Sequence, residues 1–193
     1  NLGRVLLQAT EAQQFQLAKT CLLSFTSLGW HYTVGDAKGF TAIHYAIKHK
    51  HYEFLDNLLH MGMDPHKTLA DGLSPMQYAI SKNDTAAIEL IMIRDAAQST
   101  RNINYTTYLH EAIKSHHIDI INLLLQTRYC HLAEKIEGKT AFDLVCEQNP
   151  RDWLLIGQLV DAVRALTPQP EKDDFNLGRV LLQATEAQQF QLA

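Results

Sequence analysis

The sequence predicts an all-α solenoid of about four helix-pair repeats closed by helical caps. The first observation is a fixed period, because Thr41, Ser74, Thr107 and Thr140 follow one another at intervals of 33 residues. The second is alanine at one position of three successive units, at Ala46, Ala79 and Ala112. The third is an apolar pair twelve residues after each alanine, at Leu58-Leu59, Ile91-Met92 and Leu124-Leu125. Self-similarity at such a period is typical of repeat architectures.

Each set of residues that recurs at the 33-residue interval, here called a column, has a physical role in a unit made of a turn and two antiparallel helices. Thr or Ser at the head is expected to cap the first helix, since its hydroxyl can accept an amide hydrogen of the first turn. Alanine suits a close approach of helices, and the apolar pair adds to the buried face of the second helix. Glycine fits a positive φ in the preceding turn, at Gly39, Gly72 and Gly138, whereas Tyr105 predicts a distorted third turn. The turn between the helices has Lys50, Asn83, His116 and Asn149, of which asparagine tolerates a left-handed backbone best.

These units resemble ankyrin repeats, whose core reads T-P-L-H-x-A before a second helix that ends in Leu-Leu. The first unit matches at Thr41, Ile43, His44 and Ala46, the second at Ser74, Pro75, Met76 and Ala79, and the third at Thr107, Leu109, His110 and Ala112. The fourth keeps Gly138, Thr140, Ala141 and Phe142 but has Asp143 in place of histidine. The resemblance covers about residues 36–166 and implies an all-α ankyrin-repeat solenoid.

The period divides the chain into a cap, repeats, a linker and a terminal copy. A capping helix pair is expected at 1–35, with Val5, Leu6, Phe15, Leu22 and Leu23 among its buried residues. Ankyrin repeats are expected at about 36–68, 69–101, 102–134 and 135–166, followed by a polar linker at 167–175. The last helix would bury Trp153, Ile156, Leu159, Val160 and Val163.

Residues 176–193 repeat residues 1–18 without a difference. The offset of 175 residues is not a multiple of the 33-residue period, so the copy is not another repeat of the same kind. One hypothesis is self-association, in which the copied helix docks where residues 1–18 would lie on a neighbouring molecule. The alternatives are a cap on the last repeat of its own chain, an engineered duplication and a recent tandem duplication.

Charge and composition restrict the classes of partner. Lys and Arg number 17 against 21 Asp and Glu, for a net charge of -4, which argues against binding to nucleic acid. No apolar run is long enough to span a bilayer, and the first residues lack the pattern of a signal peptide. Because the chain does not begin with Met, we expect a fragment. Cys21, Cys130 and Cys146 are widely spaced, which favours reduced thiols and a cytoplasmic protein. The repeats are low in Gly and rich in His, Asn and Ile, and in this they resemble diverged bacterial ankyrin proteins, including host-directed effectors, which implies a host-cytosol location if the protein is secreted.

No motif in the sequence predicts catalysis, a cofactor or a metal site. The ten histidines show no zinc-ligand spacing and no H-E-x-x-H. The resemblance gives His44 and His110 a structural hydrogen bond to neighbouring backbone, and His51 and His117 share a second such column. Neither a G-x-S-x-G nor a glycine-rich phosphate loop occurs.

The resemblance implies that partners contact the hairpin tips and the concave face of the first helices. Carried onto this chain, it gives nine candidates: Lys38, Phe40, Tyr45, Lys48, Leu73, Tyr78, Ser81, Glu111 and Lys114. We expect Phe40, Tyr45 and Tyr78 to form an aromatic strip, flanked by Lys38, Lys48 and Lys82, that accepts an apolar or acidic segment. The alternative is that the tyrosines are ordinary half-exposed residues that cover the stack.

The sequence therefore predicts a non-catalytic module that binds an unidentified partner protein. Two alternatives remain open at this stage. The chain could be the targeting domain of a larger enzyme or effector, or an engineered assembly unit with swapped helices.

Overall fold

The computed structural model describes residues 2–26, 34–68, 72–97, 104–127, 130–132, 134–148, 155–159 and 161. These residues fold into α-helices and turns without a β-strand, apart from an isolated bridge between Ile136 and Lys139. The chain divides into two compact units, residues 1–101 and 102–193. The all-α prediction is confirmed, whereas the boundaries between repeats stay predictions.

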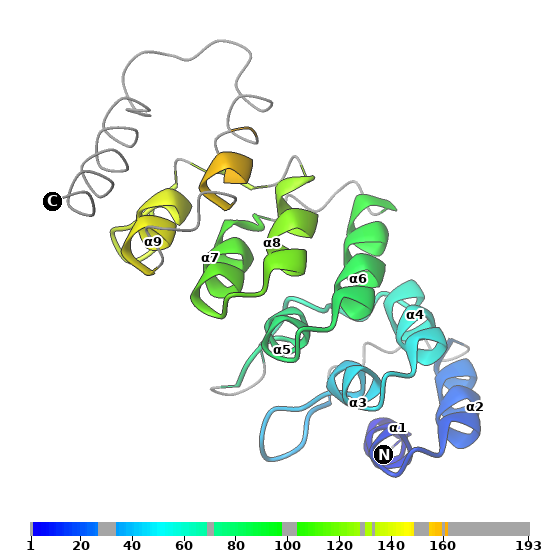
Figure 1. Cartoon of the computed structure of the whole chain (residues 1–193). Helices are drawn as coiled ribbons and strands as arrows, with labels where there is room; N and C mark the ends of the chain where they lie inside the picture. Colours follow the sequence, from blue (N-terminus) through cyan, green and yellow to red (C-terminus); the bar gives the residue numbers. More distant parts are fainter. Residues whose placement is uncertain are drawn as a thin grey trace, which may run out of the picture. The chain divides into compact units, whose positions relative to one another are not determined.

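Three helix pairs make up the described part of the first unit (Figure 1). They are α1 (Leu2–Glu11) with α2 (Phe15–Thr26), α3 (Ala42–Lys48) with α4 (Tyr52–His60), and α5 (Pro75–Ser81) with α6 (Thr85–Ala97). The first helices of the pairs pack in one row, α1 on α3 on α5, and the second helices in another, α2 on α4 on α6. Because α3 is covered on both sides, every residue from Ala42 to Ile47 is buried.

The second unit contains α7 (Thr106–Lys114), α8 (Ile118–Leu125) and α9 (Ala141–Gln148), and residues 155–159 are also helical. Helix α7 packs against both α8 and α9. Ile156 and Leu159 are buried as predicted. Trp153, Val160 and Val163 lie outside the described residues, as do the predicted linker 167–175 and the copied segment 176–193.

Helix caps confirm most of the Thr/Ser column. The Ser74 hydroxyl accepts from the Gln77 amide at 3.2 Å, and the Gln77 side chain accepts from the Ser74 amide at 2.9 Å. Thr140 forms the same reciprocal pair with Asp143, whose carboxylate accepts from the Thr140 amide at 2.9 Å. Asp143 therefore serves as a capping residue where the other units have histidine or glutamine.

The third repeat departs from the predicted cap. Helix α7 starts at Thr106 with Tyr105 at the N-cap, so Thr107 lies inside the helix and does not cap it. The Thr106 amide donates to the Asn104 side chain at 2.9 Å, and the Thr106 hydroxyl accepts from the His131 amide at 2.9 Å. Gly39 and Gly138 have the expected positive φ of 78° and 82°, but Tyr105 has φ -82° and is buried. The bulky residue in the glycine position thus shifts the helix start.

The N-terminal pair buries only some of the residues predicted for its core. Leu6 and Leu22 are buried and Phe15 is half-buried, but Val5 is 39% and Leu23 is 64% exposed. Leu7, Thr10, Ala18 and Cys21 are buried instead. The prediction was wrong at Val5 and Leu23 because this pair does not follow the 33-residue register, so no column showed which face meets α3.

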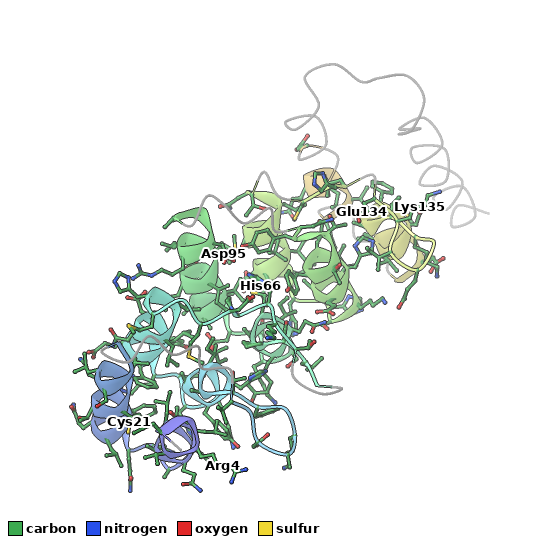
Figure 2. The ribbon with its side chains drawn as sticks, turned by 180° about the vertical axis from the view of Figure 1, so that it is seen from behind. Arg4, Cys21, His66, Asp95, Glu134 and Lys135 are labelled. Atoms are coloured by element: carbon green, nitrogen blue, oxygen red, sulfur yellow. The ribbon has the colours of Figure 1, made fainter. Side chains whose placement is uncertain are left out.

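The loop that follows α4 is attached to α5 and α6. The His66 ring donates from Nε2 to the Asp95 carboxylate on α6 at 2.7 Å (Figure 2). The Pro65 carbonyl accepts from the Met76 amide in α5 at 2.9 Å. These two hydrogen bonds place the loop that leads to the start of α5.

Non-glycine residues with a left-handed backbone occupy the turns between paired helices. Lys50 has φ 53°, Asn83 φ 52° and His116 φ 55°, and Gln13 in the first pair has φ 59°. Asn149 lies outside the described residues. A left-handed backbone is unfavourable for a residue with a Cβ, and least so for asparagine.

Lys50→Gly should therefore raise the free energy of unfolding by about 0.5–1 kcal/mol, since glycine removes the Cβ clash but adds chain entropy to the unfolded state. Asn83→Gly, at the corresponding turn of the next pair, should gain less than Lys50→Gly. Urea unfolding followed by circular dichroism measures both variants. A larger gain for Asn83→Gly would contradict this account of the turns.

Candidate partner-binding surface

Side chains from two neighbouring helix pairs meet in an aromatic cluster made of Phe40, His44, Tyr45 and Tyr78. The Phe40 ring, in the turn before α3, stacks on His44 with centroids 4.9 Å apart. It meets Tyr78 edge-on at 5.1 Å and Tyr45 edge-on at 5.9 Å, a favoured geometry for aromatic pairs. The three residues predicted to form an aromatic strip are thus in contact.

The tyrosines of the cluster are more deeply buried than the sequence suggests. Tyr45 is 4% and Tyr78 is 7% exposed. Phe40 packs on both rings, and the Nζ atoms of Lys48 and Lys82 lie over Tyr45 and Tyr78 at 5.4 and 5.5 Å from the ring centres. Lysine stems cover apolar surface while their ammonium groups stay in water, so a partner would meet the lysines first.

Hydrogen bonds fix Tyr45 at one end of the cluster. Its hydroxyl donates to the Asp36 carboxylate at 2.8 Å, and the other oxygen of Asp36 accepts from the amides of Lys38 and Phe40, each at 2.8 Å. Burial, with hydrogen bonds to Asp36 and Glu11, raises the pKa of Tyr45 well above its ordinary value. Partial burial disfavours the charge of Asp36, but the Phe40 amide and the Tyr45 hydroxyl outweigh it and hold the Asp36 pKa below its ordinary value.

His44 links the cluster to the next hairpin tip. Its Nδ1 accepts from the Thr41 amide at 3.0 Å, and its Nε2 donates to the Leu73 carbonyl at 3.0 Å. In the second unit, His110 Nε2 likewise donates to the Lys139 carbonyl at 3.0 Å. The predicted structural role of both histidines is confirmed. In the second histidine column, the His51 ring accepts from the Phe54 amide at 3.1 Å, whereas His117 caps α8 without a side-chain bond.

The candidates of the first unit surround this cluster. Lys38, Lys48, Leu73 and Ser81 are exposed, and Phe40 is half-buried. The Leu73 carbonyl is held by His44, while the Leu73 side chain is 45% exposed. The Ser81 hydroxyl donates to the Tyr78 carbonyl at 2.8 Å. Seven of the nine candidates therefore belong to one unit, beside or within one cluster.

The other two candidates belong to the second unit. Glu111 is half-buried and Lys114 is exposed, and both lie on α7. The Lys114 ammonium pairs with the Glu137 carboxylate at 2.9 Å. Lys139 in turn pairs with Glu147. Lys114 is thus already neutralised within the second compact unit.

The sequence did not predict the two acidic residues that interact with Tyr45. Asp36 stands at the start of the first turn, three residues before Gly39. Aspartate at such a position often accepts hydrogen bonds from the backbone amides of the turn, and this signal could have predicted its role. Glu11 comes from α1, which lies outside the repeat register, so no column relates it to Tyr45. Lys82 was recognised as a flanking cation, and the structure places it over Tyr78.

Metal ligands and thiols are the reactive side chains to consider among the described residues. No group of three or more metal-ligand side chains occurs among them. The cysteines are free, and burial raises the pKa of the Cys130 thiol to about 11 and also raises that of Cys146. Such thiols are mostly protonated near neutral pH and are poor nucleophiles. Within the same residues, no helix is long and apolar enough to cross a membrane.

The structure is a helical-repeat scaffold. Its helix pairs stack on one another, and His44 and His110 are each bonded to the turn before the next pair. Comparison with protein families agrees, because the family model described as ankyrin repeats in three copies matches residues 49–136. Residues 49–136 therefore match ankyrin repeats, and the all-α fold of the described residues agrees with that match.

A curated relative supports this assignment. The ankyrin repeat protein L371 of Acanthamoeba polyphaga mimivirus is 25% identical over 139 residues, which cover 67% of this chain and 18% of the relative. The chain therefore spans less than a fifth of the length of the relative that it matches.

Proposed function

We propose that this chain binds a segment of a partner protein through the exposed residues around the aromatic cluster. Ankyrin repeats are general protein–protein interaction modules, and the family is typically non-catalytic. The proposed surface consists of Lys38, Phe40, Lys48, Leu73 and Ser81, supported by the buried rings of Tyr45 and Tyr78. On the second unit, Glu111 and Lys114 are the proposed contacts at corresponding positions.

Leu73 is the observation that carries this proposal. Its backbone is fixed by His44, and its large apolar side chain remains 45% exposed beside the aromatic cluster. A rigid apolar anchor loses little conformational entropy on binding, which favours affinity. The surrounding hydrogen bonds of Asp36, Tyr45 and Ser81 add to this rigidity.

The cytosol is the proposed location. Its support is that all three cysteines are free, two of them buried, which is typical of proteins in reducing compartments. Self-association through residues 176–193 stays a proposal from the sequence alone.

Leu73→Asp should abolish retention of a specific partner in an affinity pull-down, because it puts a charge where an apolar contact forms. Ile93→Asp is the matched control, since Ile93 on α6 is 63% exposed and distant in sequence from the tips. Both variants should keep the helical circular dichroism of the unmodified chain. A partner retained equally by the Leu73 and Ile93 variants would reject this surface.

A further inference from the structure

Two lysines of the first unit differ from the corresponding lysine of the second in their ion pairing. Lys48 and Lys82 lie over tyrosine rings, and neither has a carboxylate partner among the described residues. Lys114, which occupies the register position of Lys48 two units later, is paired with Glu137. Unneutralised cations therefore gather beside the aromatic cluster although the chain as a whole has a net charge of -4.

The two ends of the cluster also differ in their hydrogen bonding. The Tyr45 hydroxyl donates to Asp36, and Glu11 also contributes to raising its pKa. Outside the cluster, the hydroxyl of Tyr52 in α4 also has a carboxylate acceptor, Asp84, at 3.0 Å. The Tyr78 hydroxyl has no acceptor among the described residues, and only burial raises the pKa of Tyr78. The end at Tyr78 thus combines a free hydroxyl donor with the nearby ammonium of Lys82.

We propose that the partner segment is acidic, with carboxylates received by Lys82, the Tyr78 hydroxyl and Lys48, and an apolar side chain placed against Leu73. This inference rests on the proposed function and adds the chemistry of the partner. A carboxylate can accept hydrogen bonds from both a lysine ammonium and a phenol hydroxyl, and charge-assisted hydrogen bonds of this type are the stronger kind. Asp36 and Glu11 at the Tyr45 end repel carboxylates, and Lys48 over the Tyr45 ring offsets this repulsion, so the strongest attraction for a carboxylate is at Lys82 and Tyr78.

The net negative charge of the chain favours a peptide over a nucleic acid as the ligand. Binding to a phosphate backbone needs many cations along an extended surface, whereas a short acidic segment needs two or three donors. Leu73 supplies the apolar contact that a protein segment can use and a phosphate backbone cannot.

Fluorescence anisotropy with the full chain tests the inference. The probe is a short fluorescein-labelled peptide in which Glu alternates with Leu, and its counterpart has Gln for every Glu. We expect the Glu peptide to bind more tightly, and its affinity to fall as salt is raised, because exposed charges are screened. Lys48→Gln and Lys82→Gln should each weaken binding about three- to tenfold, as expected for partly exposed charged pairs. Tyr78→Phe should weaken it about two- to tenfold while keeping the buried ring.

Lys19→Gln is the matched control and should leave peptide affinity unchanged, since Lys19 lies on α2, outside the proposed surface, and its ammonium already pairs with Glu53. Equal binding of the Glu and Gln peptides, or no binding of either, would overturn the acidic specificity. The pull-down with Leu73→Asp tests the proposed function separately, because it asks only whether a retained partner needs this surface and not whether that partner is acidic. If a mixed-sequence single-stranded DNA bound with the same dependence on Lys48 and Lys82, the proposal that the ligand is a protein segment would be wrong.

Discussion

Tyr45→Ala should lower the free energy of unfolding of the first unit by about 3–5 kcal/mol, the usual range for removing a buried aromatic ring. Tyr45 is 4% exposed and contacts Phe40, and its hydroxyl donates to Asp36 at 2.8 Å. The substitution therefore leaves a cavity beside α3 and removes a hydrogen bond. Urea unfolding followed by circular dichroism measures the loss.

Tyr45→Phe separates the two contributions, because it keeps the ring and removes only the hydroxyl. We expect it to cost about 1 kcal/mol, the net value of a typical hydrogen bond. Leu73→Ala, at an exposed position of the same surface, should change stability by less than about 0.5 kcal/mol. A cost below about 1 kcal/mol for Tyr45→Ala would contradict the burial of this ring.

This stability cost decides how the surface can be studied. Alanine at Tyr45 or Tyr78 would weaken binding through loss of the fold, so it could not locate a contact. The sequence placed both tyrosines on the binding face, but it did not show how deeply Phe40 and the two lysine stems cover them. Exposed positions such as Leu73, Lys48 and Lys82 give a cleaner test.

The 33-residue register explains which features could be predicted from the sequence. The capping residues and the histidines recur at that interval in the same local turn, so the caps at Ser74 and Thr140 and the bonds of His44 and His110 to the next hairpin were predictable. The register fails where a side chain breaks it, as Tyr105 does by moving the start of α7 to Thr106.

Contacts between segments outside the register were not predictable. Glu11 approaches Tyr45 from α1, and the His49 ring approaches the Glu11 carbonyl at 3.2 Å. Nothing in a single sequence relates these positions, because the N-terminal pair has its own spacing. For the same reason the exposed sides of Val5 and Leu23 could not be assigned.

His44→Ala should cost about 3 kcal/mol, because it opens a cavity and leaves the buried Thr41 amide without its acceptor. The His44 side chain is fully buried, and both of its ring nitrogens are bonded. His110→Ala should also destabilise the second unit, since it opens a cavity at a buried position and removes the hydrogen bonds to the Thr106 and Lys139 carbonyls. His131→Ala is the control, because its ring is exposed. Urea unfolding of each variant measures these losses.

The His44 effect should also depend on pH. Burial lowers the pKa of His44 from its ordinary value of 6.5, although the hydrogen bond to Leu73 and the charge of Asp36 oppose the shift. Protonation of Nδ1 would displace the Thr41 amide, so the folded state retains the neutral ring. Below about pH 6.5 the unfolded chain therefore binds a proton that the folded chain does not, and stability falls as pH drops through this range.

Measuring the free energy of unfolding against pH for the unmodified chain and for His44→Ala isolates the contribution of His44 titration. The unmodified chain should lose more stability than His44→Ala between pH 7 and pH 5, because the variant lacks the titrating group. The lowered pKa of Asp36 acts in a lower range, since the stability it contributes is lost only as pH falls below the ordinary value of 3.8. Parallel curves for the two proteins above pH 5 would show that His44 titrates alike in the folded and unfolded chains. The neutral hydrogen-bonded ring would then not be what links α3 to the next hairpin tip.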